Sequence, residues 1–241
     1  PYFLELVASR VFFPVPRKAI EQQGDQWIRA DPLPCSGPYL LEGWRVNDRF
    51  RLRRNPRYWD ADRVATERID ILSGDNPSTA LNLFLKGEVD LISDRKIIPG
   101  ELGPELAQRP DFQRFDYLGQ DFIRFNTTRK PFQDSRVRRA VAMAIDRSRI
   151  TARITRMGER ASAAVTPAGT GGYEPPAGLP WDPSAARALL SEAGYPSGRG
   201  FPVIEYTFNV GSRIYEQTGV EVQSMLREHL GIRVELRPLE W

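Results

Sequence analysis

The chain has 241 residues, of which 41% are hydrophobic and 27% are charged, so it holds enough apolar residues for one large or two modest globular domains. Basic and acidic residues are nearly balanced, 34 against 31, for a net charge of +3, which favours a solvated surface over a face that binds nucleic acid. The longest purely apolar run, residues 140–145, is too short to span a membrane, and residues 1–20 do not show the order of regions typical of a secretory signal.

The first third of the chain predicts a short helix followed by antiparallel strands. We expect the helix over residues 17–27. Residues 39–44 and 49–53 alternate in polarity around a short polar link, which is the pattern of a β-hairpin. Residues 68–72 alternate in the same way and predict the next strand.

The second strand of the hairpin carries an arginine at every other position. Phe50 and Leu52 are expected to face inward, so Arg49, Arg51 and Arg53 share the wet face. Such a stripe is able to bind phosphate groups, and a nucleic-acid binder is therefore one alternative. A solvated sheet face balanced by acidic neighbours is the interpretation that we favour.

The middle of the chain alternates between helix and strand. Residues 77–85 predict a helix with proline in its first turn, which Gly87 ends. A strand is expected over residues 88–92, and this alternation favours an α/β lobe. Asp94 follows that strand at its carboxyl end, where open α/β sheets bind ligands. Residues 112–118 predict another strand.

The segment from Asp121 to Ile150 predicts a strand, a tight link and two capped helices. Residues 122–126 alternate with the period of a strand. Asp134 stands at a helix N-cap position, and apolar residues recur at helical spacing over residues 137–145. Asp146 is expected to cap a second helix over residues 147–156.

The last quarter of the chain predicts helix, strand, helix and strand. Asp182 is expected to cap a helix that Gly194 ends. Residues 201–209 and 232–236 have strand character. Residues 214–230 between them have the spacing of an amphipathic helix.

The residues that carry most enzyme chemistry are scarce. Cys35 is the only cysteine and His229 the only histidine, so an intramolecular disulfide and a His/Cys metal cluster are excluded. A Ser-His-Asp triad would have to use His229, and no Gly-x-Ser-x-Gly elbow is present. Glu101 and Glu105 form a carboxylate pair, but at this spacing we expect them to be solvated. We therefore expect a binding protein with no catalytic residue, no metal and no cofactor.

Three stretches of the sequence resemble a known family. They are Gly37-Pro38-Tyr39 with Trp44 and Asn55-Pro56-Arg57-Tyr58-Trp59, then FNTTRKPFQDSRVRRAVAMAIDRSRI over residues 125–150, and WDPSAARALLSEAGYPSG over residues 181–198. Several uncommon residues recur at set separations, so the signal is specific. The chain resembles family 5 of the bacterial periplasmic solute-binding proteins, which includes the oligopeptide- and dipeptide-binding proteins of ABC importers.

The resemblance implies a fold and a division into lobes. The fold would be α/β and periplasmic binding protein-like (type II, cluster C), with two lobes of which the chain holds a part, built from mixed sheets flanked by helices. Residues 1–120 would belong to lobe I and residues 121–241 to lobe III, with a hinge crossing near residues 118–122. Since members of the family are considerably longer, we expect the chain to be an internal or C-terminal portion.

The resemblance also implies a function. The protein would be the substrate-binding component of an ABC importer that captures peptides in a cleft between lobes and delivers them to a membrane permease. It would be a periplasmic monomer, or anchored to the cell surface by a lipid in its full-length form, and it would bind no nucleic acid.

Seven candidate ligand contacts follow from placing the family's cleft loops on this sequence: Asp94, Asp121, Phe122, Arg124, Asn209, Arg213 and Tyr215. Their charged members suit the charged ends of a ligand, since charge-assisted hydrogen bonds are strong, and the two aromatic residues would form apolar walls. Arg124 departs from the acidic or neutral residue expected near this place in general peptide binders. The alternative is therefore the same fold with a non-peptide ligand, such as a sugar, an opine-like compound or an acidic compound.

Overall fold

The computed structural model describes residues 3–29, 33–74, 76–94 and 97–240. The chain falls into two compact units, Pro1–Asp75 and Asn76–Trp241. A division by compactness does not test where the lobes of a binding protein meet, so the lobe boundary near residues 118–122 stays a prediction.

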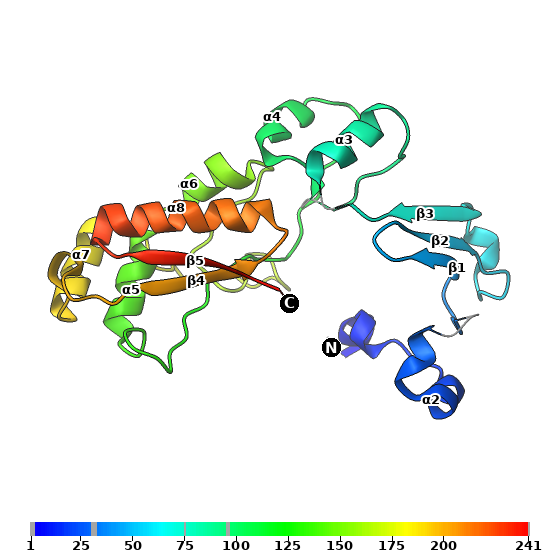
Figure 1. Ribbon diagram of the computed structural model, residues 1–241, viewed down its shortest axis with the longest axis horizontal. Coiled ribbons are helices and arrows are strands. Elements are labelled where there is room, and N and C mark those ends of the chain that lie inside the picture. The colour runs from blue at the N-terminus through cyan, green and yellow to red at the C-terminus, as the bar shows by residue number, and fades with distance from the viewer. Residues whose placement is uncertain (1–2, 30–32, 75, 95–96, 241) are drawn as a thin grey trace. The chain divides into compact units, whose positions relative to one another are not determined.

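The first unit is built on a three-stranded antiparallel sheet (Figure 1). Strands β1 (Tyr39–Arg45), β2 (Arg49–Arg54) and β3 (Arg68–Leu72) lie in this order, which confirms the predicted hairpin and the strand after it. Two short helices precede the sheet, α1 (Phe3–Val7) and α2 (Arg17–Gln23).

A buried asparagine joins the two ends of the hairpin. Asn55 is only 3% exposed, and its side-chain Nδ2 donates to the carbonyl of Gly37 over 2.8 Å. Its Oδ1 accepts the backbone N–H of Arg57 over 3.0 Å, and its own backbone N–H donates to the carbonyl of Pro38. The motifs Gly37-Pro38-Tyr39 and Asn55-Pro56-Arg57 are therefore joined in the fold, because Asn55 of the second binds the backbone of the first.

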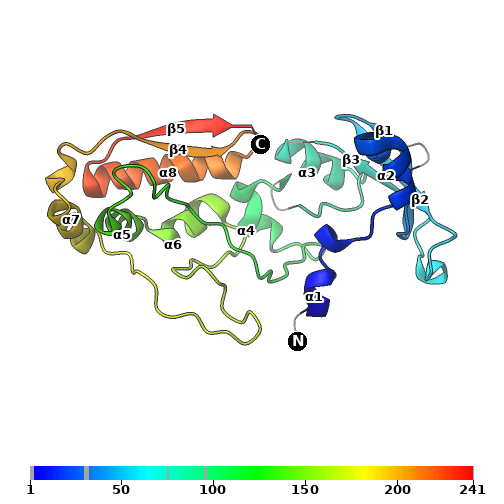
Figure 2. The same cartoon turned by 90° about the horizontal axis from the view of Figure 1, so that it is seen from below.

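The second unit contains a parallel β-α-β unit. Strand β4 (Ile204–Asn209) pairs in register with β5 (Val234–Leu239), from Ile204 opposite Val234 to Asn209 opposite Leu239. Helix α8 (Arg213–Leu230) connects the two strands and lies along them in Figure 2. A parallel pair needs a crossover of this kind, and the predicted strand, helix and strand are confirmed.

Helices α5 and α7 pack with α8 around the core of the second unit. They are α5 (Ser135–Ala144) and α7 (Pro183–Glu192). The large buried side chains of this core come from all three helices and from the residue two positions before β5: Val137, Val141, Leu190, Val222, Met225, Leu226, Leu230 and Ile232. Burial of these apolar side chains is the main favourable contribution to folding of the unit.

The remaining helices of the second unit are short. They are α3 (Pro77–Leu85), α4 (Gly103–Leu106) and α6 (Arg147–Ile150), with a π-helical turn over Thr151–Thr155 after α6. The yellow-green chain between this turn and α7 runs as a long loop (Figure 2). No helix in the described ranges is long and apolar enough to cross a membrane.

The predicted helix caps are confirmed at three aspartates. Asp134 accepts the backbone N–H of Arg136 over 2.8 Å, and Asp146 accepts that of Arg149 over 3.1 Å. Asp182 accepts the backbone N–H groups of Ser184 and Ala185 over 3.0 and 2.9 Å. Each carboxylate satisfies donors that have no partner within the first helical turn.

Three predicted strands are wrong. Residues 88–92, 112–118 and 122–126 carry no strand. Alternating polarity makes a segment suitable for a sheet, but a strand forms only where a neighbouring backbone completes the ladder of hydrogen bonds. Within the described residues the ladders join β1 to β2, β2 to β3, and β4 to β5.

Candidate functional site

The candidate site is at the carboxyl ends of β4 and β5, where α8 begins. Asn209 is the last residue of β4, and the next residue's backbone N–H donates to the carbonyl of Leu239 over 3.0 Å. Gly211 turns the chain with a φ of +82°. Ser212 caps α8 by accepting the backbone N–H of Tyr215 over 3.4 Å. The turn therefore places Asn209, Arg213 and Tyr215 around the first turn of α8, at the edge where parallel sheets bind ligands.

The segment from Asp121 to Phe125 is held against this edge. The hydroxyl of Tyr215 donates to Asp121 Oδ1 over 3.3 Å, across 94 residues of sequence. At the other end of the segment, the ring of Phe125 lies 5.0 Å from that of Phe132, and both rings pack on the buried core. Two candidates that lie far apart in the sequence, Asp121 and Tyr215, are thus in direct contact.

Phe122 and Arg124 form an exposed pair on the same segment. Phe122 is 63% exposed, and Arg124 Cζ lies 6.0 Å from the centre of its ring. This distance is within the range of a cation–π contact. Phe122 is therefore an exposed apolar surface beside a cation, and its role as a wall of a binding site stays a prediction.

Arg213 has a carboxylate neighbour that the sequence patterns did not place at the site. Its Nη1 lies 3.9 Å from Glu101 Oε1, and Glu101 belongs to the 3-10 turn Gly100–Leu102. No local pattern connects two residues so far apart in the chain, so only the folded structure brings Glu101 to the site. Asp94 is exposed in the coil after α3, and its backbone carbonyl accepts the N–H of Ile97 over 3.1 Å.

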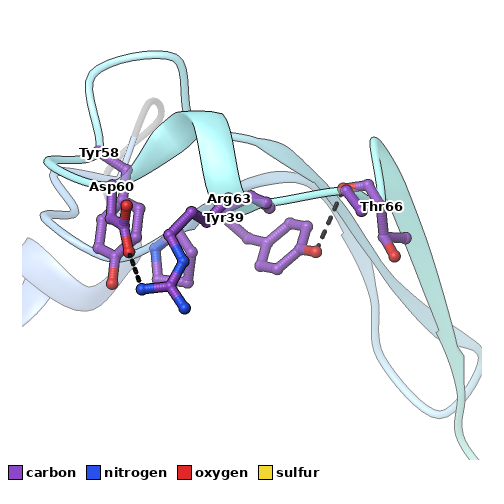
Figure 3. A pocket seen from close by; sticks show the side chains of 8 residues that line it. Tyr39, Tyr58, Asp60, Arg63 and Thr66 are labelled. Atoms are coloured by element: carbon purple, nitrogen blue, oxygen red, sulfur yellow. Dashed lines mark hydrogen bonds and ion pairs between the residues drawn. The ribbon is translucent and has the colours of Figure 1, made fainter.

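A pocket of about 540 Å³ lies in the first unit (Figure 3). Several of the polar groups that line it contact one another. The hydroxyl of Tyr39 donates to the carbonyl of Thr66 over 3.2 Å, and Arg63 Nη1 lies 3.6 Å from Asp60 Oδ2. Because these groups already have partners, the pocket is a weaker candidate for a polar ligand than the edge of β4 and β5.

Two of the arginines of β2 lie beside an acidic residue of β3. Arg51 Nε donates to Asp70 Oδ1 over 3.0 Å, and Arg49 Nη1 lies 3.9 Å from Asp70 Oδ2. The hydrogen bond from Arg51 lowers the pKa of Asp70 below its ordinary value. This pairing neutralises part of the positive stripe, which suits a solvated sheet face better than a phosphate-binding one.

Metal-binding side chains do not gather in the described residues. Within residues 3–29, 33–74, 76–94 and 97–240, the side chains of histidine, cysteine, aspartate and glutamate form no group of three or more that could hold a metal ion. The candidate site instead offers hydrogen-bonding groups of both charges and an aromatic surface. These groups are suited to binding a polar ligand through charge-assisted and aromatic contacts.

Comparison with known proteins decides the family. The model of the bacterial extracellular solute-binding proteins, family 5 (middle part), matches residues 1–241. The chain belongs to this family. The resemblance stated from the sequence motifs is thereby confirmed.

Family 5 relatives match along the whole chain. The periplasmic oligopeptide-binding protein OppA of Salmonella typhimurium is 30% identical over 249 residues, which cover 100% of this chain and 45% of the relative. The protein named probable deoxycholate-binding periplasmic protein YgiS, of Escherichia coli, is also 30% identical, with the same two shares. The chain thus spans a little under half the length of these family 5 relatives.

A solved structure confirms the fold. A periplasmic oligopeptide-binding protein from Borrelia burgdorferi superposes with a TM-score of 0.86 at 30% identity, over 100% of this chain and 48% of that one. The expected α/β fold of the periplasmic binding proteins, present in part, is confirmed. All three of these relatives are named as binding proteins rather than as enzymes.

Proposed function

We propose that the protein is the substrate-binding component of an ABC importer, which captures peptides in a cleft between lobes and delivers them to a membrane permease. The observation that carries the proposal is the match of family 5 over residues 1–241. The relatives named for oligopeptide binding support peptides as the substrate class.

The chemistry of the candidate site supports a zwitterionic, extended ligand. Asp121 offers a carboxylate, while Arg124 and Arg213 offer guanidinium groups, so both charged ends of a peptide have possible partners. The backbone of residues 121–126 is outside any ladder of the described sheets. Its N–H and C=O groups suit the addition of a peptide in extended conformation, in which main-chain hydrogen bonds give affinity.

Closure of the lobes would couple binding to delivery. In this proposal residues 1–120 are part of lobe I, residues 121–241 are part of lobe III, and the hinge is near residues 118–122. Few backbone dihedrals, near Gly119, would absorb the rotation. A permease that binds the closed form more tightly than the open form would then respond to the bound peptide.

The proposal also covers the location, the oligomeric state and the ligand contacts of the protein. It acts as a periplasmic monomer, or as a lipid-anchored protein at the cell surface, and it releases its ligand chemically unchanged. No metal, cofactor or nucleic acid takes part. Asp94, Asp121, Phe122, Arg124, Asn209, Arg213 and Tyr215 are its proposed ligand contacts.

The test is to identify what the protein carries. The complete gene product is purified without refolding and denatured, and the released small molecules are analysed by mass spectrometry. The same protein, refolded without ligand, is then heated with and without a pool of tri- to pentapeptides. We expect a set of short peptides in the first measurement and a higher melting temperature with the pool in the second.

Two outcomes would contradict the proposal. If the protein releases one non-peptide compound, for example deoxycholate, which is in the name of YgiS, the proposed substrate class is wrong. The proposed mechanism of capture and delivery would still apply to that compound. If the purified protein contains no ligand and the peptide pool does not raise its melting temperature, the protein does not bind peptides and the proposal is wrong.

A further inference from the structure

Two arginines at the candidate site differ in whether a carboxylate of the protein is close to them. Arg213 lies 3.9 Å from Glu101. Arg124 is exposed, its contact is the ring of Phe122, and no ion pair joins it to a carboxylate within the described ranges 3–29, 33–74, 76–94 and 97–240. Of these two arginines, Arg124 is therefore the one whose guanidinium is available to an anionic group of a ligand.

The backbone on both sides of Arg124 has a contact with the rest of the second unit. Three residues before it, Asp121 is bound by the hydroxyl of Tyr215. The residue directly after it, Phe125, packs on Phe132 and the buried core. A side chain that leaves the chain between two such contacts is presented from a fixed point, which reduces the entropy lost when a ligand binds it.

The aromatic neighbour suits the guanidinium for binding a carboxylate. The ring of Phe122 lies 6.0 Å from Arg124 Cζ and attracts the cation without using its hydrogen-bond donors. Those donors form a planar fork that matches the two oxygens of a carboxylate.

We propose that Arg124 binds a carboxylate of the ligand, so that the protein prefers peptides with an acidic side chain. The inference rests on the proposed peptide-binding function and specifies the substrate class of the same site. The carboxyl terminus of a peptide offers the same chemistry, so the experiment has to separate these two sources.

The experiment compares three synthetic pools of tri- to pentapeptides built on alanine. The first pool has one internal glutamate and a free carboxyl terminus, the second has glutamine instead, and the third has glutamine and an amidated terminus. Calorimetric titration of the ligand-free complete gene product measures the affinity for each pool. Arg124→Gln tests the proposed contact, and Arg129→Gln is the control, because it removes the same charge from an exposed position five residues further along the chain.

We expect the unaltered protein to bind the glutamate pool about tenfold or more tightly than the glutamine pool. Arg124→Gln should remove this preference, while Arg129→Gln should retain it. The unaltered protein could instead prefer the free terminus over the amidated one, and Arg124→Gln could remove that preference. Arg124 would then bind the terminal carboxylate of the peptide, and the proposed preference for acidic side chains would be wrong.

Three results would overturn the inference. If Arg124→Gln leaves every preference of the unaltered protein unchanged, Arg124 does not bind the carboxylate. If the unaltered protein binds the three pools equally, peptide binding stands and the carboxylate preference alone is wrong. If it binds none of them, the proposed function fails, and this inference fails with it.

Discussion

The hydroxyl of Tyr215, in the first turn of α8, donates a hydrogen bond of 3.3 Å to the carboxylate of Asp121. The contact joins a helix that follows β4 to a segment far earlier in the chain. Because Phe125 packs on the core at the other end of that segment, the tyrosine contributes to the position of the intervening residues. These include Phe122 and Arg124.

Removal of this hydroxyl should therefore affect binding more than stability. For Tyr215→Phe we expect a loss of peptide affinity of about three- to tenfold, and a change in the free energy of unfolding of about 1 kcal/mol or less. Tyr173→Phe, which removes a hydroxyl from the loop before α7, is the control and should leave the affinity unchanged. Calorimetry and urea unfolding measure the two quantities, and an unaltered affinity in Tyr215→Phe would argue against a role for the contact in presenting the segment.

Asn55→Ala should destabilise the first unit. The substitution leaves the carbonyl of Gly37 and the backbone N–H of Arg57 without their partner, and such a loss at a buried site costs about 1–3 kcal/mol. Urea unfolding followed by tryptophan fluorescence detects it, since Trp44 and Trp59 both lie in this unit. Asn82→Ala, at an exposed position of α3, should change the stability by less than about 0.5 kcal/mol. Equal effects of the two substitutions would show that Asn55 is not a structural anchor.

Leu190→Ala should be among the more damaging substitutions in the second unit. Leu190 is 1% exposed and packs in the core shared by α5, α7 and α8, so its truncation leaves a cavity and should cost about 2–5 kcal/mol. Its neighbour Leu189 is only partly buried, and Leu189→Ala should cost clearly less. Urea unfolding of both variants checks the order, and a larger loss for Leu189→Ala would contradict the described packing of α7.

Acid should weaken the cap of α5. A side-chain hydrogen bond from Arg136, together with the backbone N–H of Arg136, lowers the pKa of Asp134 below its ordinary value. Since the folded-state pKa is depressed, the contribution of this carboxylate is fully present above the unfolded pKa of about 3.9. It is lost as the pH falls through the lower folded value.

Asp134→Asn retains a capping oxygen but has no charge to titrate. The stability difference between Asp134→Asn and the unaltered protein should therefore shrink as the pH falls from 7 into the acidic range below about 4. Arg136→Gln, which retains the backbone hydrogen bond to Asp134, should show a flatter pH dependence than the unaltered protein. Chemical unfolding at a series of pH values measures this, and a difference that stays constant with pH would contradict the depressed pKa.

Local sequence was sufficient to predict the helices and their caps. Asp134, Asp146 and Asp182 stand directly before their helices, and the hydrogen bonds that they accept join residues two or three positions apart. The hairpin of β1 and β2, and the order strand, helix and strand of β4, α8 and β5, follow from local patterns for the same reason, whereas the parallel pairing of β4 with β5 is seen only in the structure. Their polarity periods are local, and their partners follow within a short stretch of chain.

Three strand predictions were wrong because a strand also needs a pairing partner elsewhere in the chain. Residues 88–92, 112–118 and 122–126 alternate as strands do, yet no ladder forms on them in the described structure, because polarity does not specify which backbone pairs with which. Sequence by itself determined the family, the helices and the types of residue offered to a ligand. Only the tertiary structure decided that Tyr215 binds Asp121 and that Glu101 lies beside Arg213, because hydrogen bonds and ion pairs between residues so far apart form only when folding brings their elements together.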